Sequence, residues 1–406
     1  MFDIAKVRKD FPVLNRIDPV IYLDSGATSL KPQCVIDAVV DYYTNHSVNI
    51  HRGDYDMSFK VSELYDKARL NIASFINADG DEIIFTSGAT AALNLAALQF
   101  GARVLNEGDV ILTTESEHAS NILPLFHIAK LKKAKIEYVT LTDEGALTLS
   151  NFKKAMHDKV KLVAITHVSN VVGYISPIKE IAAVTHEHDA YIIVDGAQSV
   201  PHIPVDVKAL DVDFLAFSGH KMLSPTGVGV LYGKKELLAM IDPLFYGGGS
   251  NARFDRDGNV ILKSTPDKFE AGTPAIEGVL GLSKAVDYLK ALKMENIALY
   301  EDELRQYLIR ELKNLSNVIV YNPHATGGII ALNVKDIFSQ DAAAYLNAHN
   351  IAVRAGNHCA KILKGVLKTD DTIRCSLYFY NTKAEIDEFV KRLKEVTIEN
   401  CINLII

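Results

Sequence analysis

The strongest constraint on the fold is a series of six short, β-rich apolar runs between residues 82 and 219. They lie at residues 82–86, 109–114, 135–141, 161–168, 190–196 and 214–219. Apolar residues follow one another almost without interruption in these runs, which is typical of strands that are buried on both faces. Helical patterns, such as residues 91–105 and 176–188, separate the runs. The sequence therefore predicts an α/β protein with a parallel-rich sheet sandwiched by helices.

The pattern changes after about residue 285. A long charged helix is expected at about residues 292–315, followed by further elements at 327–334, 339–350, 351–356 and 372–380. The last helix begins with Thr382-x-x-Glu385, a capping box whose side chains bind the first free N–H groups of a helix. Because 406 residues exceed what one hydrophobic core usually serves, two domains are expected. We predict a large domain at 21–285 and a smaller α+β domain at 286–406, with residues 1–20 packed on the smaller one.

Composition and charge argue against several classes of function. The chain has 43 Lys and Arg against 50 Asp and Glu, a net charge of −7, and no basic block, so no nucleic-acid partner is expected. No run of 18 uncharged apolar residues is present, so no membrane span is expected either. The few cysteines form no Cys-x-x-Cys pair and indicate a reducing compartment, for which we expect the cytoplasm. They are Cys34, Cys359, Cys375 and Cys401.

Two residues at strand ends carry the main chemical signal. Lys221 closes Ser218-Gly219-His220-Lys221, directly after an apolar run, where desolvation would lower its pKa and make it a nucleophile toward an aldehyde. The alternative is a lysine at a helix start that points to solvent. Asp195 ends another apolar run, 26 residues earlier. An Asp that holds a pyridinium nitrogen, with a Lys that forms a Schiff base, is a recurring signature of pyridoxal phosphate. A metal ligand or a helix cap are the alternatives for Asp195.

Other side chains could complete a cofactor site. Thr90 ends Thr86-Ser87-Gly88-Ala89-Thr90, a strand-to-helix turn of small residues that could approach a phosphate, although many such turns look alike. Ser218 and His220 offer side-chain donors for the same phosphate. His118 could stack on a pyridine ring or be a structural histidine. Gln198 could bind the phenolic oxygen of the cofactor.

The region around Cys359 indicates a reactive cysteine. Cys359 lies in Arg354-Ala355-Gly356-Asn357-His358-Cys359-Ala360, a polar, turn-rich stretch. Reactive cysteines are exposed near cationic groups, and we expect Arg354, His358 and Lys361 to supply that environment and lower the thiol pKa. The other cysteines are interpreted as structural or incidental.

A substrate carboxylate has candidate partners as well. Arg374 suits such a group because its guanidinium is a planar bidentate donor, although an ordinary strand-edge salt bridge is the alternative. Asn170 ends an apolar strand, where open α/β sheets bind ligands. Arg354 is the third residue expected to bind the substrate.

Together these motifs resemble class II cysteine desulfurases, which are pyridoxal-phosphate enzymes of the group V aminotransferase fold. The resemblance covers roughly residues 12–395. Its motifs, in order, are YLDSGATSLKP, HRGDYDMS, FTSGATAALN, EHASNILP, THVSNVVG, VDGAQSVPH, FSGHKMLSPTGVGVLYG, FEAGTP and RAGNHCA. The last of these, followed by RCSLYFYNT, narrows the resemblance to the branch of cysteine desulfurases and selenocysteine lyases.

The resemblance implies a fold and a set of residue roles. The fold would be the aspartate-aminotransferase-like fold type I, with a mostly parallel seven-stranded sheet in the large domain and a smaller α+β C-terminal domain. Lys221 would form the Schiff base and Cys359 the persulfide, with His118 stacked on the ring, and no metal is expected. The implied cofactor ligands are Thr90, Asp195, Gln198, Ser218 and His220, joined by Thr273 from the other subunit of a homodimer. The implied contacts of the substrate carboxylate are Asn170 and Arg374.

Four positions depart from the family pattern. Ala91 stands where a Glu is frequent, and Asn357 where a His is usual. Residues 361–363 replace a run that contains proline, and Asp267-Lys268 replaces an aromatic-arginine pair. These departures leave the expected cofactor contacts in place. We expect any difference from the family in the Cys359 loop and in the surface that a partner binds.

The reaction expected from the resemblance is the conversion of L-cysteine to L-alanine. Lys221 would remove the Cα proton as general base, and the Cys359 thiolate would attack the substrate sulfur and become a persulfide. A sulfur-acceptor protein of an iron–sulfur assembly system is the expected partner. The alternatives are a selenocysteine lyase, which would take L-selenocysteine, a transaminase of the same fold, and a sulfur-delivery scaffold without catalysis.

Overall fold

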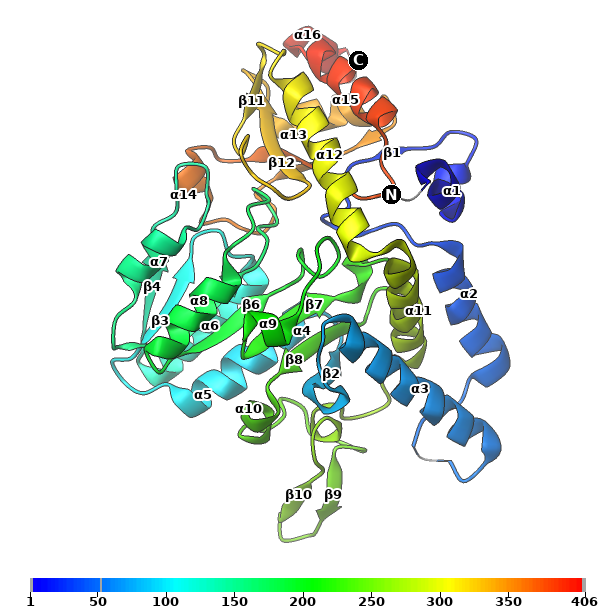
Figure 1. Cartoon of the computed structure of the whole chain (residues 1–406), viewed down its shortest axis with the longest axis vertical. Helices are drawn as coiled ribbons and strands as arrows, with labels where there is room; N and C mark the ends of the chain where they lie inside the picture. The colour runs from blue at the N-terminus through cyan, green and yellow to red at the C-terminus, as the bar shows by residue number, and fades with distance from the viewer. Residues whose placement is uncertain (1–2, 52, 404–406) are drawn as a thin grey trace.

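The computed structural model describes residues 3–51 and 53–403. A seven-stranded sheet with helices on both faces occupies the centre, and a second, smaller sheet with its own helices lies at one end (Figure 1). Within the described residues, no helix is long and apolar enough to cross a membrane. The predicted α/β class is confirmed.

The central sheet has the strand order β2-β8-β7-β6-β5-β3-β4. Neighbouring strands from β7 to β4 pair in parallel, and β8 is antiparallel to both of its neighbours. All six predicted runs form strands, but β8 is an additional strand that we did not predict. The strands are β2 (Ile83–Thr86), β3 (Val110–Thr114), β4 (Lys135–Val139), β5 (Val160–Thr166), β6 (Tyr191–Asp195), β7 (Phe214–Ser218) and β8 (Gly229–Gly233).

The apolar runs form this sheet because successive side chains of a strand enter two different cores. In β5, Val163 and Ile165 belong to the core under α3, α7, α8 and α11, whereas Leu162 and Ala164 belong to the core under α4 and α6. Both faces are thus covered, as a parallel sheet requires. The helices of this part are α2 (Gln33–Asp41), α3 (Asp56–Phe75), α4 (Ala89–Leu95), α5 (Gly101–Val104), α6 (Ala119–Lys132), α7 (Leu149–Ala155), α8 (Ile178–Glu187), α9 (Val207–Leu210), α10 (Lys235–Ala239) and α11 (Ile276–Leu292).

The C-terminal part contains a four-stranded antiparallel sheet in the order β11-β12-β15-β14. The predicted capping box of Thr382 and Glu385 is present at the start of α15. The strand predicted at 351–356 is divided in two, because β13 pairs with β1 near the N-terminus and β14 pairs with β15. The elements are β11 (Val318–Val320), β12 (Ile329–Val334), β13 (Ile351–Ala352), β14 (Arg354–Gly356), β15 (Thr372–Ser376), α12 (Met294–Leu312), α13 (Ser339–Asn347), α14 (Lys364–Leu367), α15 (Lys383–Glu395) and α16 (Ile398–Ile402).

The N-terminal segment closes the junction between the two parts. It contains α1 (Ile4–Lys9) and continues to β1 (Ile21–Tyr22). The fully buried Phe11 ring contacts Tyr288 on α11 and the rings of Phe379 and Tyr380. The domain boundaries at residues 20 and 285 stay predictions, and residues 1, 2, 52 and 404–406 of the predicted domains lie outside the described residues.

One hairpin projects from the molecule. It consists of β9 (Asn251–Phe254) and β10 (Val260–Leu262) and extends from the lower end of the body in Figure 1. Phe254 and Ile261 on this hairpin are exposed.

Candidate active site

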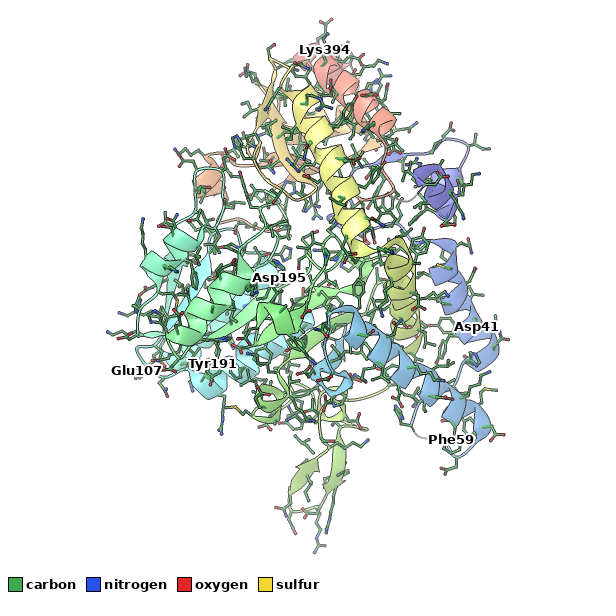
Figure 2. The ribbon with its side chains drawn as sticks, in the orientation of Figure 1. Asp41, Phe59, Glu107, Tyr191, Asp195 and Lys394 are labelled. Atoms are coloured by element: carbon green, nitrogen blue, oxygen red, sulfur yellow. The ribbon has the colours of Figure 1, made fainter. Side chains whose placement is uncertain are left out.

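A cavity of about 200 Å³ lies at the carboxyl ends of the parallel strands. Asp195 ends β6, Ser218 ends β7, and Figure 2 marks Asp195 at the end of the sheet that faces the C-terminal part. Eleven of the twelve predicted site residues line the cavity, namely Thr90, His118, Asn170, Asp195, Gln198, Ser218, His220, Lys221, Arg354, Cys359 and Arg374. The topology therefore brings together side chains that are as far apart as 284 residues in the sequence.

Lys221 lies in a short 3₁₀ turn, η5 (Gly219–Lys221), that follows β7 directly. Burial lowers the pKa of Lys221 to about 8, an effect that Asp195 opposes and Arg374 reinforces. The side chain lines the cavity instead of extending into bulk solvent. The structure thus favours the nucleophile or base over the solvent-exposed lysine.

Asp195 and Gln198 follow one another around the turn after β6. The Asp195 carboxylate is buried and its Oδ1 accepts the backbone N–H of Ala197 at 2.9 Å. Gln198 donates one Nε2 hydrogen to the carbonyl of Gly26 at 2.7 Å, which leaves its second amide hydrogen for another acceptor. Among the residues that the structure describes, no group of three or more His, Cys, Asp or Glu residues could hold a metal ion.

Hydroxyl and imidazole groups also line the cavity. Ser218 Oγ accepts the N–H of Ala89 at 2.8 Å, and Thr90 Oγ1 lies 2.7 Å from Ser120 Oγ. Burial lowers the pKa of His220 to about 4, with further lowering by Lys221, so its ring is neutral near pH 7. Ser120 lines the same cavity and was missed in the sequence, where nothing distinguished it from other polar residues near a helix start.

His118 caps a helix and also lines the cavity, whereas its stacking on a cofactor ring stays a prediction. Its Nδ1 accepts the N–H of Ser120 at 3.1 Å and caps α6. Nδ1 is then an acceptor, so the neutral ring carries its proton on Nε2. Burial, followed by the charge of Lys221, lowers the pKa of His118. The ring is consequently a fixed, uncharged plane on the cavity wall.

Cys359 lies on a loop with an unusual backbone. His358 and Cys359 have φ values of 49° and 62°, a left-handed conformation that costs a residue with a Cβ roughly 1–2 kcal/mol. Two hydrogen bonds fix this loop: Ala119 N–H donates to the Cys359 carbonyl at 2.8 Å, and Asn170 Nδ2 donates to the His358 carbonyl at 2.8 Å. The thiol of Cys359 is exposed.

The prediction that His358 is a cation beside Cys359 is wrong. The His358 ring is buried and its Nε2 lies 2.9 Å from Thr372 Oγ1. Burial, reinforced by Arg374, lowers the pKa of His358 to about 3. Its ring is therefore neutral at physiological pH and supplies no positive charge beside Cys359.

Arg374 is a buried residue that lines the cavity and already has partners. Its Nη2 donates to Asp24 Oδ1 at 2.8 Å and its Nη1 to the Asn170 carbonyl at 3.0 Å, whereas the buried Nε has no partner. Arg374 forms a salt bridge with Asp24, but it lies on β15, between β12 and β14, and so the alternative of an ordinary strand-edge salt bridge does not describe it. Its role as a clamp for a substrate carboxylate stays a prediction. Asp24 was missed because its motif suggested no role.

Thr273 is the one predicted residue outside this cavity. It lines a separate cavity of about 370 Å³ together with Phe85, Thr86 and Phe245. Its hydroxyl accepts a hydrogen bond from Asn49 Nδ2 at 3.3 Å. A role in a partner subunit stays a prediction.

Comparison with known proteins supports the resemblance. The model of the class-V aminotransferase family matches residues 21–389. A probable cysteine desulfurase from Halalkalibacterium halodurans is 44% identical over 394 residues, which are 96% of this chain and 97% of that protein. The apo structure of the cysteine desulfurase from Thermococcus onnurineus superposes with a TM-score of 0.93 at 38% identity, covering 97% of this chain and 98% of that one.

A second solved structure extends the agreement. The cysteine desulfurase CsdA from Escherichia coli, in an S-sulfonic acid form, has a TM-score of 0.91 at 32% identity and covers 100% of this chain and 99% of its own. The fold predicted from the motifs is thereby confirmed over the full length. With its central sheet, its strand-end cavity and these relatives, the chain belongs to the class-V aminotransferase family.

Proposed function

We propose that this chain is a pyridoxal-phosphate-dependent cysteine desulfurase that converts L-cysteine to L-alanine and carries the sulfur as a persulfide on Cys359. One observation carries the proposal: an exposed cysteine opens onto the same cavity as a half-buried lysine and a buried aspartate. The relatives named cysteine desulfurase support it.

The side chains around the cavity fit the cofactor. Asp195 offers a buried carboxylate for a pyridinium N–H, and Gln198 has an amide hydrogen left for the phenolic oxygen. The hydroxyls of Thr90 and Ser218 and the neutral His220 ring suit a phosphate. When bound, pyridoxal phosphate withdraws electrons from the substrate Cα and makes its proton acidic.

The protein supplies the base, the substrate clamp and the sulfur acceptor. Lys221, with its pKa lowered to about 8, takes the Cα proton and can return it to the carbon product. The unpartnered Nε–H of Arg374 and the guanidinium of Arg354 hold the substrate carboxylate. Asn170 acts mainly as a positioning residue, because its amide holds the carbonyl of His358.

Sulfur transfer balances within the site. The Cys359 thiolate attacks the substrate sulfur, an S–S bond forms, and the C–S bond breaks with its electron pair left on carbon. A proton then completes L-alanine. The exposed position of Cys359 lets a second protein take the sulfur from the persulfide, and an acceptor of an iron–sulfur assembly system is our candidate.

Assembly and location complete the proposal. We assign Thr273 to the phosphate of the partner subunit in a homodimer, because it faces a cavity other than the one that holds Lys221. The sparse cysteines favour the cytoplasm.

A selenocysteine lyase is the second candidate, and Cys359 separates the two activities. A C–Se bond is weaker than a C–S bond and can break by elimination, without a thiolate to receive the chalcogen. We expect Cys359→Ala to lose nearly all alanine release from L-cysteine and to keep much of it from L-selenocysteine. A transaminase of the same fold would need no cysteine for either substrate.

The test measures alanine from each substrate for four single Cys→Ala variants at saturating cofactor. Cys34, Cys375 and Cys401 are matched controls, because none of them lines the cavity and burial raises the thiol pKa of each. Undiminished cysteine turnover by Cys359→Ala would show that this loop does not carry the sulfur and would overturn the proposal.

A further inference from the structure

A third, much smaller cavity adjoins the candidate active site at Gln198. Its volume is about 20 Å³, and it is enclosed by four segments: the turn after β5, the turn after β6, helix α12 and the residues just before β12. Among the described residues, Gln198 alone lines both this cavity and the active-site cavity. The side chain of a proposed cofactor ligand thus forms the wall between them.

Three buried polar atoms of the residues that line this cavity have no hydrogen-bond partner. They are Oε1 of Gln198, Nε2 of His202 and Oε1 of Glu301. The Glu301 carboxylate is already held by His202 and by the backbone of Phe379. The Gln198 side chain cannot turn its amide around, because its Nε2 donates to the Gly26 carbonyl at 2.7 Å and a reversed amide would set two oxygens against each other. Buried polar groups are almost always hydrogen-bonded, so Gln198 Oε1 and His202 Nε2 call for a partner that the protein itself does not provide.

The chemistry of Gln198 Oε1 and His202 Nε2 determines what kind of group can bind both. The carbonyl of Gln198 only accepts hydrogen bonds. His202 binds the buried Glu301 carboxylate through Nδ1 at 2.8 Å, so in the neutral ring that donates to a carboxylate, Nε2 is also an acceptor. Two acceptors cannot bind each other, and a group with two hydrogens joins them.

We propose that this cavity binds one water molecule, which donates one hydrogen to Gln198 Oε1 and the other to His202 Nε2. A single water needs about 10–15 Å³ of such space and two to four polar partners, and the cavity meets both conditions. His202 is in turn held by Glu301 on α12 and by a T-shaped contact with the Tyr378 ring, whose centroid lies 4.6 Å away.

The water gives His202 a positioning role toward the cofactor. It fixes the Gln198 amide in the orientation that keeps the second Nε2 hydrogen directed away from the small cavity. The chain of contacts runs from Gln198 through the water to His202 and then to Glu301 on α12. The orientation of the Gln198 amide therefore depends on α12, the helix that leads into the C-terminal part.

The first test is a high-resolution crystal structure of the wild-type protein. We expect one ordered solvent peak within hydrogen-bond distance of both Gln198 Oε1 and His202 Nε2. Finding no peak there, or a direct bond between the two side chains, would overturn the proposal. This result does not depend on which reaction the protein catalyses.

The second test uses His202→Asn, because the Asn amide can keep the bond to Glu301 while it removes the acceptor at Nε2. We expect about tenfold weaker binding of pyridoxal phosphate to the apoprotein, as for the loss of one buried hydrogen bond, and a shifted visible absorption band of the bound cofactor. The matched control is His349→Asn, since His349 Nδ1 bonds the Tyr345 carbonyl at 2.9 Å far from the cavity.

The test with His202→Asn rests on the proposed cofactor, whereas the crystallographic test does not. Equal cofactor affinity and an unshifted band in His202→Asn would overturn the positioning role. Thermal unfolding of both variants separates a local effect from a loss of folding, and His202→Gln, which restores an acceptor at a similar reach, should recover the wild-type band.

Discussion

A buried ion pair beneath β2 gives the sharpest stability prediction. Arg69 on α3 forms a two-point contact with Glu270, from Nη1 to Oε1 at 2.7 Å and from Nη2 to Oε2 at 2.8 Å. Arg69 Nη1 also donates to the Ile83 carbonyl, and Glu270 Oε1 accepts the Phe85 N–H, both at 2.8 Å. The pair therefore binds α3 to the edge strand of the sheet.

The perturbation is Arg69→Met, which keeps most of the side-chain volume and removes the charge. The two side chains are only 10% and 9% exposed, so Glu270 would remain as a buried carboxylate without its cation. Breaking a buried pair in this way costs about 3–5 kcal/mol. Glu270 keeps the Phe85 N–H and the Tyr65 hydroxyl at 3.2 Å, and we therefore expect the lower end, about 3 kcal/mol.

The assay is denaturant unfolding, with Lys67→Met as the matched control on the same helix. Lys67 pairs with Glu63, but their side chains are 67% and 65% exposed, so this variant should be nearly as stable as the wild type. The double variant Arg69→Met/Glu270→Gln should regain part of the loss, because no unpaired charge is left. If Arg69→Met is no less stable than Lys67→Met, or if the double variant regains nothing, the argument from burial fails.

Three further predictions concern the site. Lys221→Ala should abolish turnover, and borohydride reduction of the wild-type holoenzyme followed by peptide mapping should find the cofactor on Lys221; a reduced adduct on another lysine would refute the assignment. Thr273→Ala should weaken cofactor retention, and light scattering should show a dimer, whereas an active, cofactor-loaded monomer would contradict us. Burial lowers the pKa of His358 to about 3. Below about pH 6.5 the unfolded chain therefore binds a proton that the folded chain does not, and the free energy of unfolding decreases as the pH is lowered. The loss of unfolding free energy in His358→Asn should be about 2 kcal/mol smaller at pH 5 than at pH 7.5; an equal loss at both pH values would contradict it.

The sequence predicted the parallel strands and failed on β8 for a physical reason. A parallel strand covered on both faces must be apolar throughout, which leaves a visible run. Strand β8 begins and ends with glycine, a residue that weakens the strand pattern. Gly229 is required there because a Cβ would lie 2.4 Å from the Cα of Gly88, so the backbone of the strand-to-helix turn packs directly on β8.

In the site, too, the residues marked by a local sequence pattern were predicted, and the contacts made only by the fold were not. Lys221 and Asp195 were predictable, because a charged residue at the end of an apolar run stands out in the sequence. The partner of Arg374 was not, since Asp24 lies 350 residues earlier and meets it only through the fold. The neutral state of His358 was missed for a related reason: its burial depends on Thr372 and β15, which no local pattern reports.

Residues 28–31 show how much of the catalytic geometry depends on such distant contacts. Thr28 Oγ1, the Ser29 N–H and Lys31 Nζ each donate to the carbonyl of His220 at 3.0 Å. That carbonyl belongs to the peptide bond that precedes Lys221, so the three donors fix the backbone from which the proposed base extends. Burial lowers the pKa of Lys31 to about 8, which shows that an ammonium is kept there at some cost. The N-terminal loop is therefore part of the active-site scaffold, although it contributes none of the proposed catalytic groups.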